Sequence, residues 1–590
     1  MQIKIYKFLK KNLTLKVIVI AGFLLRVVAL DEVPPSLNWD EISHGYNAYS
    51  ILHSAKDEWG NFLPIIFRAY GDYKLPLYIY LTSLSELIFG INAHSVRLVS
   101  VIAGTFTIYF TYFITKKLFS PSTLNLQPTI HKLIAPLAAL LVTIEPWSFF
   151  LSRGAFEANL AMSFFAAGMY FYLFGLEKPK SLIVSAVFFG FTVWTYNSYR
   201  IFTPLMIIAL ITIYKSRLLL MYKRTKTNIL IPLITMLVFL LPMFYQLTNT
   251  QGQARYFKVA IIDEGAVNKI NEMRNSRELP VFVERVIYNK GTFFIQTIAV
   301  NWASHFSTAF LFTEGGSQYQ YSLQGHGLLY KMNAIFLVVG FVFVGYLIAK
   351  KSKSGNVLLL WIVLAPLPAS ITRDSPHALR AVTVLPALMI VTALGVAVSL
   401  VCISKIFKNI KSKTLSQYFV AAYLIVLFFF IKNFLNIYFN EYKREFSWSW
   451  QYGYEEVVDY VNDNYSDYDK IIVTKKYGEP HEFFLFYGAM NNSEWTKSPD
   501  DFYEDENLVR FSKSGWYWID RFDKFYFVNN WDIPVESDKD FKLESGEVFD
   551  CDFSRCLLIT EPGNYQRDWK LKKEVYFLDG NNAFDILDNT

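Results

Sequence analysis

The sequence is poor in cysteine, in charge and in the motifs of soluble enzymes. Three of its 590 residues are cysteine, and charged residues make up 18% of the chain. It has no Walker motif or Gly-rich nucleotide fingerprint, which argues against a cytosolic nucleotide-sugar site. It has no internal repeat and no low-complexity tract either. Cys402 falls in a predicted membrane span, so a disulfide could join Cys551 to Cys556, five residues apart, or both could stay free thiols.

Apolar residues are abundant, at 53% of the chain, and the mean hydropathy is +0.25. Near-continuous apolar runs of about 18 to 22 residues, the length that spans a bilayer, recur along the chain. We count about eleven of them and predict a polytopic α-helical membrane protein. No small-residue cleavage site follows the first run, so we expect it to remain as a span. The runs start near Leu13, Ser95, Leu133, Glu157, Ser181, Ile201, Ile229, Tyr330, Asn356, Ala381 and Gln417.

Basic residues cluster at the N-terminus and in every second predicted loop. The positive-inside rule puts these segments in the cytoplasm, and an odd number of spans then puts the C-terminus outside. We therefore expect a multi-pass protein of the plasma membrane. Topology and contact with membrane lipids explain the basic loops, so no nucleic-acid partner is expected. The clusters lie at residues 4–11, 116–117, 178–180, 215–226, 350–353 and 405–413.

The predicted organisation has two domains. Residues 1–440 form a membrane domain with external loops at 31–94 and 248–328, and residues 441–590 form an extracytoplasmic α/β domain. The half-amphipathic stretch 45–54 and the aromatic stretch 293–312 are both expected to lie along the membrane surface. In the tail, helices are predicted at 454–464 and 481–489, and strands at 470–474, 525–528 and 556–560.

An acidic pair, Asp40-Glu41, follows the first span. Two adjacent carboxylates at a membrane surface are costly to desolvate, which points to a function. Such a group can deprotonate a hydroxyl acceptor or bind a cation. The alternative is a pair of solvated loop acids, but the flanking Trp39, Ile42 and Tyr46 indicate partial burial.

Several cations are predicted to lie on the same side of the membrane as the acidic pair. Each of them alone fits an interfacial anchor, with an aliphatic stem along the apolar surface. Together they predict an outward-facing ring that binds a lipid phosphate and leaves a carboxylate free as a base. The ring comprises Lys74 in Tyr73-Lys74-Leu75-Pro76, Arg97 in Ser95-Val96-Arg97-Leu98, Arg153, Arg200 and Arg380.

These motifs, in this order along residues 1–400, resemble the GT-C glycosyltransferases. The similarity is greatest to the branch of protein O-mannosyltransferases and lipid A aminoarabinose transferases. The resemblance implies transfer of a sugar from a polyprenyl-phosphate donor to a protein, lipid or glycan acceptor on the outer face, with inversion. It implies that Asp40 is the catalytic base or positions the acceptor, with Glu41 beside it, and that Lys74, Arg97, Arg153 and Arg200 hold the donor phosphate. Weaker candidates for substrate binding are Asp72, Glu157, Tyr199, His377 and Arg380.

The chain departs from the family pattern at two positions. Relatives commonly carry Lys-Pro-Pro with an acid just before the Lys, whereas Lys74 is followed by Leu75 and Asp72 lies one place earlier. Many relatives have Asp where this chain has Glu157. These departures leave the metal question open: no cofactor is expected to be required, and a divalent metal remains compatible with the sequence.

A transporter or flippase for a lipid-linked or polar substrate is the alternative function. Transporters tend to place charges near the middle of the bilayer, in broken helices. Arg26, inside the first predicted span, favours that alternative. The other charges lie at the outer ends of predicted spans, which favours the glycosyltransferase.

Overall fold

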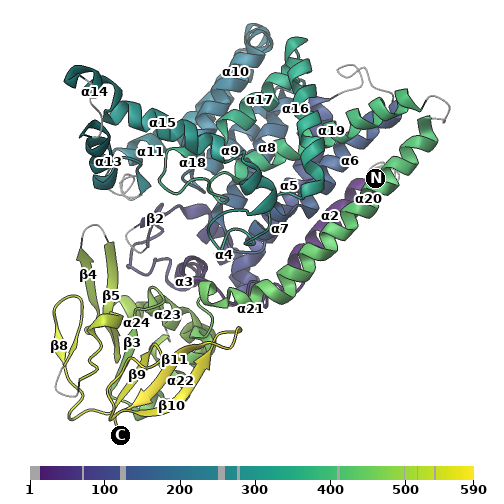
Figure 1. The fold of residues 1–590 in the computed structure, drawn as a ribbon. Coiled ribbons are helices and arrows are strands. Elements are labelled where there is room, and N and C mark those ends of the chain that lie inside the picture. Colours follow the sequence, from purple (N-terminus) through teal and green to yellow (C-terminus); the bar gives the residue numbers. More distant parts are fainter. Residues whose placement is uncertain are drawn as a thin grey trace. The chain divides into compact units, whose positions relative to one another are not determined.

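The computed structural model describes residues 13–69, 72–119, 128–249, 259–275, 280–407, 412–496, 498–513, 516–536 and 540–590. The chain forms two compact units, drawn with their helices and strands in Figure 1. We call residues 1–28, 100–152 and 156–435 the helical unit. Residues 29–99, 153–155 and 436–590 form the loop–sheet unit. The domain boundary expected near residue 440 stays a prediction.

Each of the eleven apolar runs forms a helix, which confirms a polytopic helical membrane fold. Within the described residues, eight helical segments are long and apolar enough to cross a membrane. They contain α5, α8, α10, α11, α19 and α20, and also α16 and α17, each counted together with a short helix that adjoins it, as Lys331–Ala349 and Lys353–Ser370. Helices α2, α6 and α9 are shorter. The eleven are α2 (Leu13–Val27), α5 (Ala93–Leu118), α6 (Pro128–Ile144), α8 (Glu157–Gly175), α9 (Ser181–Val193), α10 (Tyr199–Arg224), α11 (Thr227–Leu247), α16 (Ala334–Ala349), α17 (Lys353–Leu364), α19 (Leu385–Ile406) and α20 (Ser412–Asn436).

Shorter helices connect the spans of the helical unit. They are α7 (Pro146–Leu151), α13 (Glu264–Asn275), α14 (Val281–Ile287), α15 (Lys290–Ser304) and α18 (Leu367–Ser370). Helix α15 contains the start of the aromatic stretch that was expected to lie flat on the membrane. None of its residues is buried in the described part of the chain, and it is not among the eight long apolar helices. Its position at the membrane surface stays a prediction.

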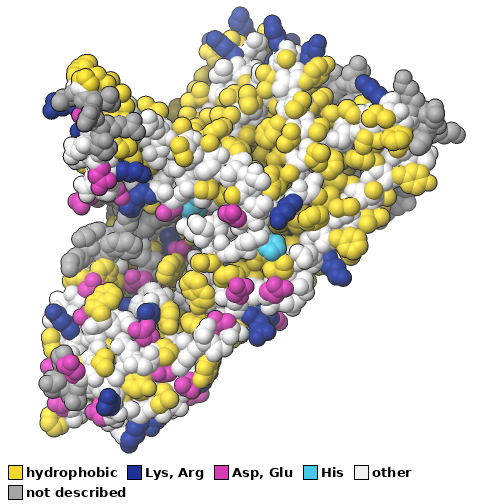
Figure 2. Space-filling model, in the orientation of Figure 1, with side chains coloured by type: hydrophobic (Ala, Val, Ile, Leu, Met, Phe, Trp, Pro, Cys, Tyr) yellow, Lys and Arg dark blue, Asp and Glu magenta, His cyan; other side chains and the backbone are white. Residues whose placement is uncertain are grey.

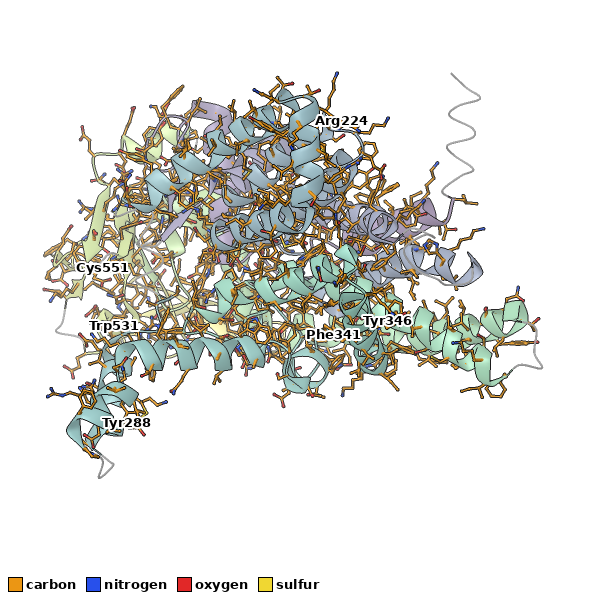
Figure 3. All side chains as sticks on the ribbon, turned by 90° about the horizontal axis from the view of Figure 1, so that it is seen from above. Arg224, Tyr288, Phe341, Tyr346, Trp531 and Cys551 are labelled. Carbon is orange, nitrogen blue, oxygen red and sulfur yellow. A yellow bond between two sulfur atoms is a disulfide. The ribbon has the colours of Figure 1, made fainter. Side chains whose placement is uncertain are left out.

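Helices α16 and α19 pack closely because glycine lies where their backbones meet. A Cβ atom on Gly395 would lie 1.7 Å from the carbonyl oxygen of Phe336, and one on Gly340 would lie 2.1 Å from that of Val391. Small residues let two membrane helices approach to backbone contact, where dispersion forces and weak hydrogen bonds act. Tyr346, labelled in Figure 3, belongs to α16 and is 55% exposed.

The surface of the helical unit has the pattern of a membrane protein. Figure 2 shows hydrophobic side chains spread over the face formed by its long helices. Lys and Arg gather where α10 and α16 end, and Figure 3 labels Arg224 at the end of α10. Lys223 and Arg224 form the last turn of α10, and Lys350 and Lys351 follow α16. Both ends belong to loops that the positive-inside rule assigns to one side of the membrane.

Arg26 is a structural residue of the helical unit. It is fully buried in α2, and its guanidinium donates hydrogen bonds of 3.0 Å to four acceptors. These are the carbonyl oxygens of Gly22, Val142 and Thr143 and the hydroxyl of Ser148. The contacts tie α2 to α6 and α7. They account for this charge within the span without a transported substrate.

The loop–sheet unit is built on a seven-stranded mixed sheet, in the order β10-β11-β9-β3-β6-β5-β4. Strand β3 (Lys470–Thr474) pairs in parallel with β6 (Phe525–Val528) and β9 (Cys556–Thr560), and the other pairs are antiparallel. The remaining strands are β4 (Val509–Lys513), β5 (Trp516–Phe522), β10 (Lys570–Tyr576) and β11 (Asn582–Asp588), with a separate hairpin of β7 (Phe541–Lys542) and β8 (Val548–Phe549).

Helices α22 (Tyr454–Asn464) and α23 (Pro480–Asn491) pack beside this sheet, and α24 (Pro499–Tyr503) follows them. The Phe484 ring lies 4.9 Å from that of Phe525, and Tyr454 lies 5.0 Å from Phe584. A second apolar cluster, which includes Ile472 and Leu558, forms another part of the core. The helices and strands predicted for the tail are confirmed. Cys551 and Cys556 form a disulfide.

The loop 31–94, which the sequence predicts to be external, folds mostly as part of the loop–sheet unit. Helix α3 (Trp39–Ser54) is followed by the hairpin of β1 (Phe67–Ala69) and β2 (Asp72–Lys74) and by α4 (Pro76–Phe89). Most residues from Gly45 to Ile51 are buried, and a Cβ on Gly45 would lie 2.3 Å from the Phe486 ring of α23. The prediction that 45–54 lies along the membrane surface is therefore wrong, because this stretch packs against α23 inside the unit.

Candidate active site

The acidic pair lies in the first turn of α3, with Asn38 as the N-cap. The Asn38 side chain accepts from the backbone N–H of Glu41 at 3.0 Å, and the Glu41 carboxylate accepts from the backbone N–H of Asn38 at 3.1 Å. This reciprocal capping box fixes the start of the helix, where the helix dipole favours negative charge. Because neighbouring helical residues project in different directions, the Asp40 side chain is 40% exposed and that of Glu41 is fully buried.

Lys74 lies against the exposed carboxylate. Its ammonium is 2.6 Å from Asp40 Oδ1 and 3.4 Å from the Asp40 carbonyl oxygen, and its side chain is only 8% exposed. Strand β2 places it there, paired with Phe67 of β1. Helix α4 begins two residues later, with Leu75 as N-cap and Pro76 in the first turn. A proline with a preset φ angle suits that position, so the Lys-Leu-Pro segment holds the ammonium at a rigid strand-to-helix turn.

Glu41 and Arg97 form a buried ion pair in the loop–sheet unit. The Arg97 Nε–H and one Nη2–H donate to the two Glu41 oxygens, both at 3.0 Å. Both Nη1–H groups donate at 2.9 Å, to the carbonyl oxygens of Leu30 and Pro34, and the second Nη2–H donates to the Ser36 carbonyl. A guanidinium has five N–H donors, and all five are used. This geometry leaves no donor for a phosphate and favours a structural role for the pair.

Arg153 supports the same segment of chain. Its Nη2 donates to the carbonyl oxygens of Ala29 at 3.0 Å and Val33 at 2.7 Å. The guanidinium also lies 5.5 Å from the Tyr438 ring centroid and 5.0 Å from that of Phe439, and the side chain is buried. Two residues further on, the Ala155 backbone N–H donates to the Glu41 carboxylate at 2.8 Å, which is the fourth hydrogen bond to that carboxylate. Two buried arginines thus hold the segment that leads into α3 through its carbonyl groups.

The other predicted site residues are distributed between the two units. Asp72 lies in strand β2, opposite Ala69, and its side chain is outside the described part of the structure. Arg200, in the helical unit, is buried and bonds the side chain of Gln246 and, at 3.3 Å, the Val193 carbonyl. Glu157 begins α8 and Tyr199 begins α10, both in the same unit.

His377 and Arg380 lie together in the turn before α19. The His377 ring lies 5.4 Å from the Tyr321 ring, and its Nδ1 accepts from the Arg380 backbone N–H at 3.4 Å. The Arg380 guanidinium donates to the Thr372 hydroxyl at 2.8 Å and lies 3.7 Å from the Asp374 carboxylate. The helical unit thus brings these two residues together, and the loop–sheet unit brings together Asp40, Glu41, Lys74, Arg97 and Arg153.

The structure contains a second cluster of polar side chains, which the sequence did not predict. Glu58, in the turn after α3, meets His481 and Glu482 of α23, with one ligand atom from each within 4.8 Å of the others. All three side chains are buried. Burial, and then the Glu482 carboxyl, raise the pKa of Glu58 well above its usual range. Burial, with Lys475 and Arg510 nearby, lowers the pKa of His481 to about 3, so its imidazole is neutral. Among the described residues this group could hold a metal ion.

A local sign of this cluster was present in the sequence. His481-Glu482 opens a predicted helix and is followed by the apolar run from Phe483 to Phe486, so a buried, chemically reactive dipeptide could have been noted. Glu58 gave no comparable sign, because its partners are far away in the chain and belong to a different part of the unit.

No protein-family model matches the sequence, and no curated protein sequence does. Solved structures do match. ArnT from Cupriavidus metallidurans bound to undecaprenyl phosphate aligns over 97% of both chains, at 11% identity and a TM-score of 0.51. The Archaeoglobus fulgidus oligosaccharyltransferase tethered to an acceptor peptide aligns over 90% of this chain and 75% of its own, at 13% identity and a TM-score of 0.47. The likeness to ArnT over nearly the whole of both chains shows that this protein has the fold of ArnT, which is the GT-C fold expected from the sequence.

Proposed function

We propose that this protein transfers a sugar from a polyprenyl-phosphate donor to a hydroxyl acceptor on the extracytoplasmic face of the plasma membrane. The observation that carries the proposal is the Asp40–Lys74 pair, in which a partly exposed carboxylate meets a nearly buried ammonium at 2.6 Å. The shared fold supports it, because the ArnT structure contains undecaprenyl phosphate. The N-terminus is proposed to be cytoplasmic and the C-terminal region extracytoplasmic, from the distribution of Lys and Arg.

In the proposed reaction the acceptor oxygen attacks the anomeric carbon of the donor sugar. The new C–O bond forms as the bond from that carbon to the phosphate oxygen breaks, and the configuration inverts. The Asp40 carboxylate accepts the proton of the acceptor hydroxyl, and the polyprenyl phosphate leaves with the bonding electron pair. Lys74 orients Asp40 by a charge-assisted hydrogen bond and stabilises the departing phosphate.

The buried residues take positioning roles in this proposal. Glu41 and Arg97 hold the start of α3, and Arg153 holds the segment before it, so that the Asp40 carboxylate faces outward. This replaces the direct phosphate contacts expected for Arg97 and Arg153, whose guanidinium groups bind main-chain carbonyls. Arg200 remains a proposed phosphate contact, and the proposed substrate contacts remain Asp72, Glu157, Tyr199, His377 and Arg380.

Donor turnover by the purified protein tests this function. The full-length protein in detergent is incubated with polyprenyl-phosphate sugars that differ in the sugar, with peptide, lipid and glycan acceptors. Release of free polyprenyl phosphate together with a glycosylated acceptor is the expected result. If no donor is consumed, but the same lipid-linked sugar crosses the bilayer of vesicles that contain the protein, the transporter or flippase is correct.

A further inference from the structure

We propose that Glu58, His481 and Glu482 bind a divalent transition-metal ion, Zn²⁺ or Mn²⁺, that ties the first external loop to the C-terminal α/β domain. The site is separate from the Asp40–Lys74 pair. It does not depend on the proposed function, because metal binding is measured without any sugar transfer.

The geometry of the three side chains suits one ion. Their ligand atoms lie within 4.8 Å of one another, whereas two ligands of one Zn²⁺ are about 3 to 4 Å apart when each bond is about 2.0–2.2 Å. A small inward shift of the side chains is therefore enough for all three to bind. Two carboxylates and one imidazole suit Zn²⁺ or Mn²⁺ better than Mg²⁺ or Ca²⁺, which prefer oxygen ligands alone.

Two buried polar atoms of the cluster point to a ligand. Among the described residues, Glu58 Oε2 and His481 Nδ1 have no hydrogen-bond partner, and both residues are only 3% exposed. Glu479 Oε2 lies 3.9 Å from His481 Nδ1, beyond hydrogen-bond distance. Buried polar atoms are nearly always satisfied, so such a pair requires an explanation. Glu58 Oε1, by contrast, accepts from the Trp59 indole N–H at 2.9 Å. This contact orients the carboxylate and leaves its other oxygen for a metal, as outer hydrogen bonds do in known metal sites.

Charge also favours a cation at this position. Two buried carboxyl groups lie side by side, and leaving both ionised without a counter-charge would be costly. The Arg510 guanidinium is one positive charge near this pair. Its hydrogen bond to Glu58, at 3.3 Å, goes to the main-chain carbonyl and not to the carboxylate, and it lies 4.7 Å from the Trp59 ring centroid. A divalent ion would neutralise both carboxylates, and a neutral imidazole can complete its coordination.

The ion would link two segments that are far apart in sequence. Glu58 belongs to the turn after α3, where the Asp57 backbone N–H donates to the Asn61 carbonyl at 3.0 Å. His481 and Glu482 lie in the first turn of α23, the helix against which α3 packs. An ion that binds the folded unit and not the unfolded chain raises the free energy of unfolding by mass action.

The competing explanation is a shared proton. If one carboxyl group of the Glu58–Glu482 pair is protonated, it can donate to the other without any metal. The two explanations predict opposite effects of Glu58→Gln. If the two carboxyl groups share a proton, the new amide donates in its place, and stability is unchanged or higher. If they bind a metal, the amide is a poor ligand, and both the metal content and the Tm fall.

Metal analysis of the purified full-length protein decides between them. The protein is loaded with Zn²⁺ or with Mn²⁺, desalted and measured by plasma mass spectrometry. We expect stoichiometric metal in the wild type and in Glu506→Gln, an exposed control in the same unit. In Glu58→Gln, His481→Gln and Glu482→Gln we expect the affinity for the loaded metal ion to fall at least about tenfold.

Chelation of the wild type adds a readout that needs no variant to fold. EDTA is expected to lower the Tm of the wild type and of Glu506→Gln and to leave that of Glu58→Gln unchanged. The proposal is overturned if the wild type holds no more metal than Glu58→Gln, or if EDTA leaves the wild-type Tm unchanged. A Glu58→Gln variant with unchanged or raised Tm and no loss of metal also overturns it, in favour of the shared proton.

Discussion

Replacing Glu41 by glutamine should destabilise the protein strongly, because it leaves the buried Arg97 charge unpaired. In the wild type, Glu41 Oε1 accepts from Arg97 Nε and the Ala155 N–H, and Oε2 accepts from Arg97 Nη2 and the Asn38 N–H. Whichever oxygen becomes the amide NH₂, that group then faces two N–H donors at hydrogen-bond distance. The variant therefore loses the ionic attraction and at least two of the four hydrogen bonds.

The expected size of the effect follows from burial. Both side chains are fully buried, and removing one partner of a buried ion pair costs about 3–5 kcal/mol. Glu32→Gln is the matched control: the Glu32 side chain is 71% exposed and lies 3.7 Å from Lys443. Exposed pairs of this kind contribute about 0–1 kcal/mol. The two variants make the same chemical change in the same unit and differ in burial.

Chemical unfolding in mixed micelles, followed by tryptophan fluorescence, measures both variants. The double variant with Arg97→Met should be less destabilised than the sum of the single variants, with a coupling energy of about 0.5–3 kcal/mol. The positioning role is refuted if Glu41→Gln unfolds like the wild type and yet loses sugar transfer. Glu41 would then act on the substrate and not on Arg97.

Three further predictions concern Lys74, the α16–α19 contact and Arg26. Lys74→Met should lower kcat/KM for sugar transfer about 10- to 100-fold, because a charge-assisted hydrogen bond contributes about 1.5–3 kcal/mol; unchanged steady-state kinetics would contradict it. Gly395→Val should lower the free energy of unfolding by about 1–3 kcal/mol or more, because the new side chain overpacks against Phe336. Gly345→Val is the control and should have no such cost, because a Cβ at Gly345 meets no heavy atom of another described element within 4 Å. Thermal melting compares the two variants. Arg26→Met should cost at least about 2 kcal/mol by leaving buried acceptors unsatisfied and should not change KM for the donor; a normal melting temperature with altered donor binding would favour the transporter.

Local patterns in the sequence were enough to predict the helices and much of the tail. Each apolar run forms a helix because hydrophobicity and length are properties of the segment itself. The predicted helix 454–464 coincides with α22, since its valines at positions 457, 458 and 461 form one apolar face. The capping box of α3 has a local sequence sign, Asn38 followed three residues later by Glu41, but this sign alone does not show in which direction each carboxylate points.

The pairing of the charged residues could not be predicted. The sequence gives the depth of Arg97 in its span but not its partner, which lies 56 residues earlier. It suggested a phosphate as the anion that satisfies this charge, whereas the structure provides Glu41 and three carbonyl groups. The cluster of Glu58 with His481 could not be predicted for the same reason. Contacts between distant segments depend on the packing of the whole unit and leave no periodic signal in either segment.

The rate of sugar transfer by Asp40→Asn tests the central claim most directly. Asparagine keeps the shape of the side chain but cannot accept the acceptor proton as a base, so transfer should fall about 10²- to 10⁴-fold. The Asp40 side chain is 40% exposed, so the variant should fold and melt nearly as the wild type does, and Asp31→Asn, at an exposed position of the same loop, should transfer normally. Transfer by Asp40→Asn at the wild-type rate would contradict the account.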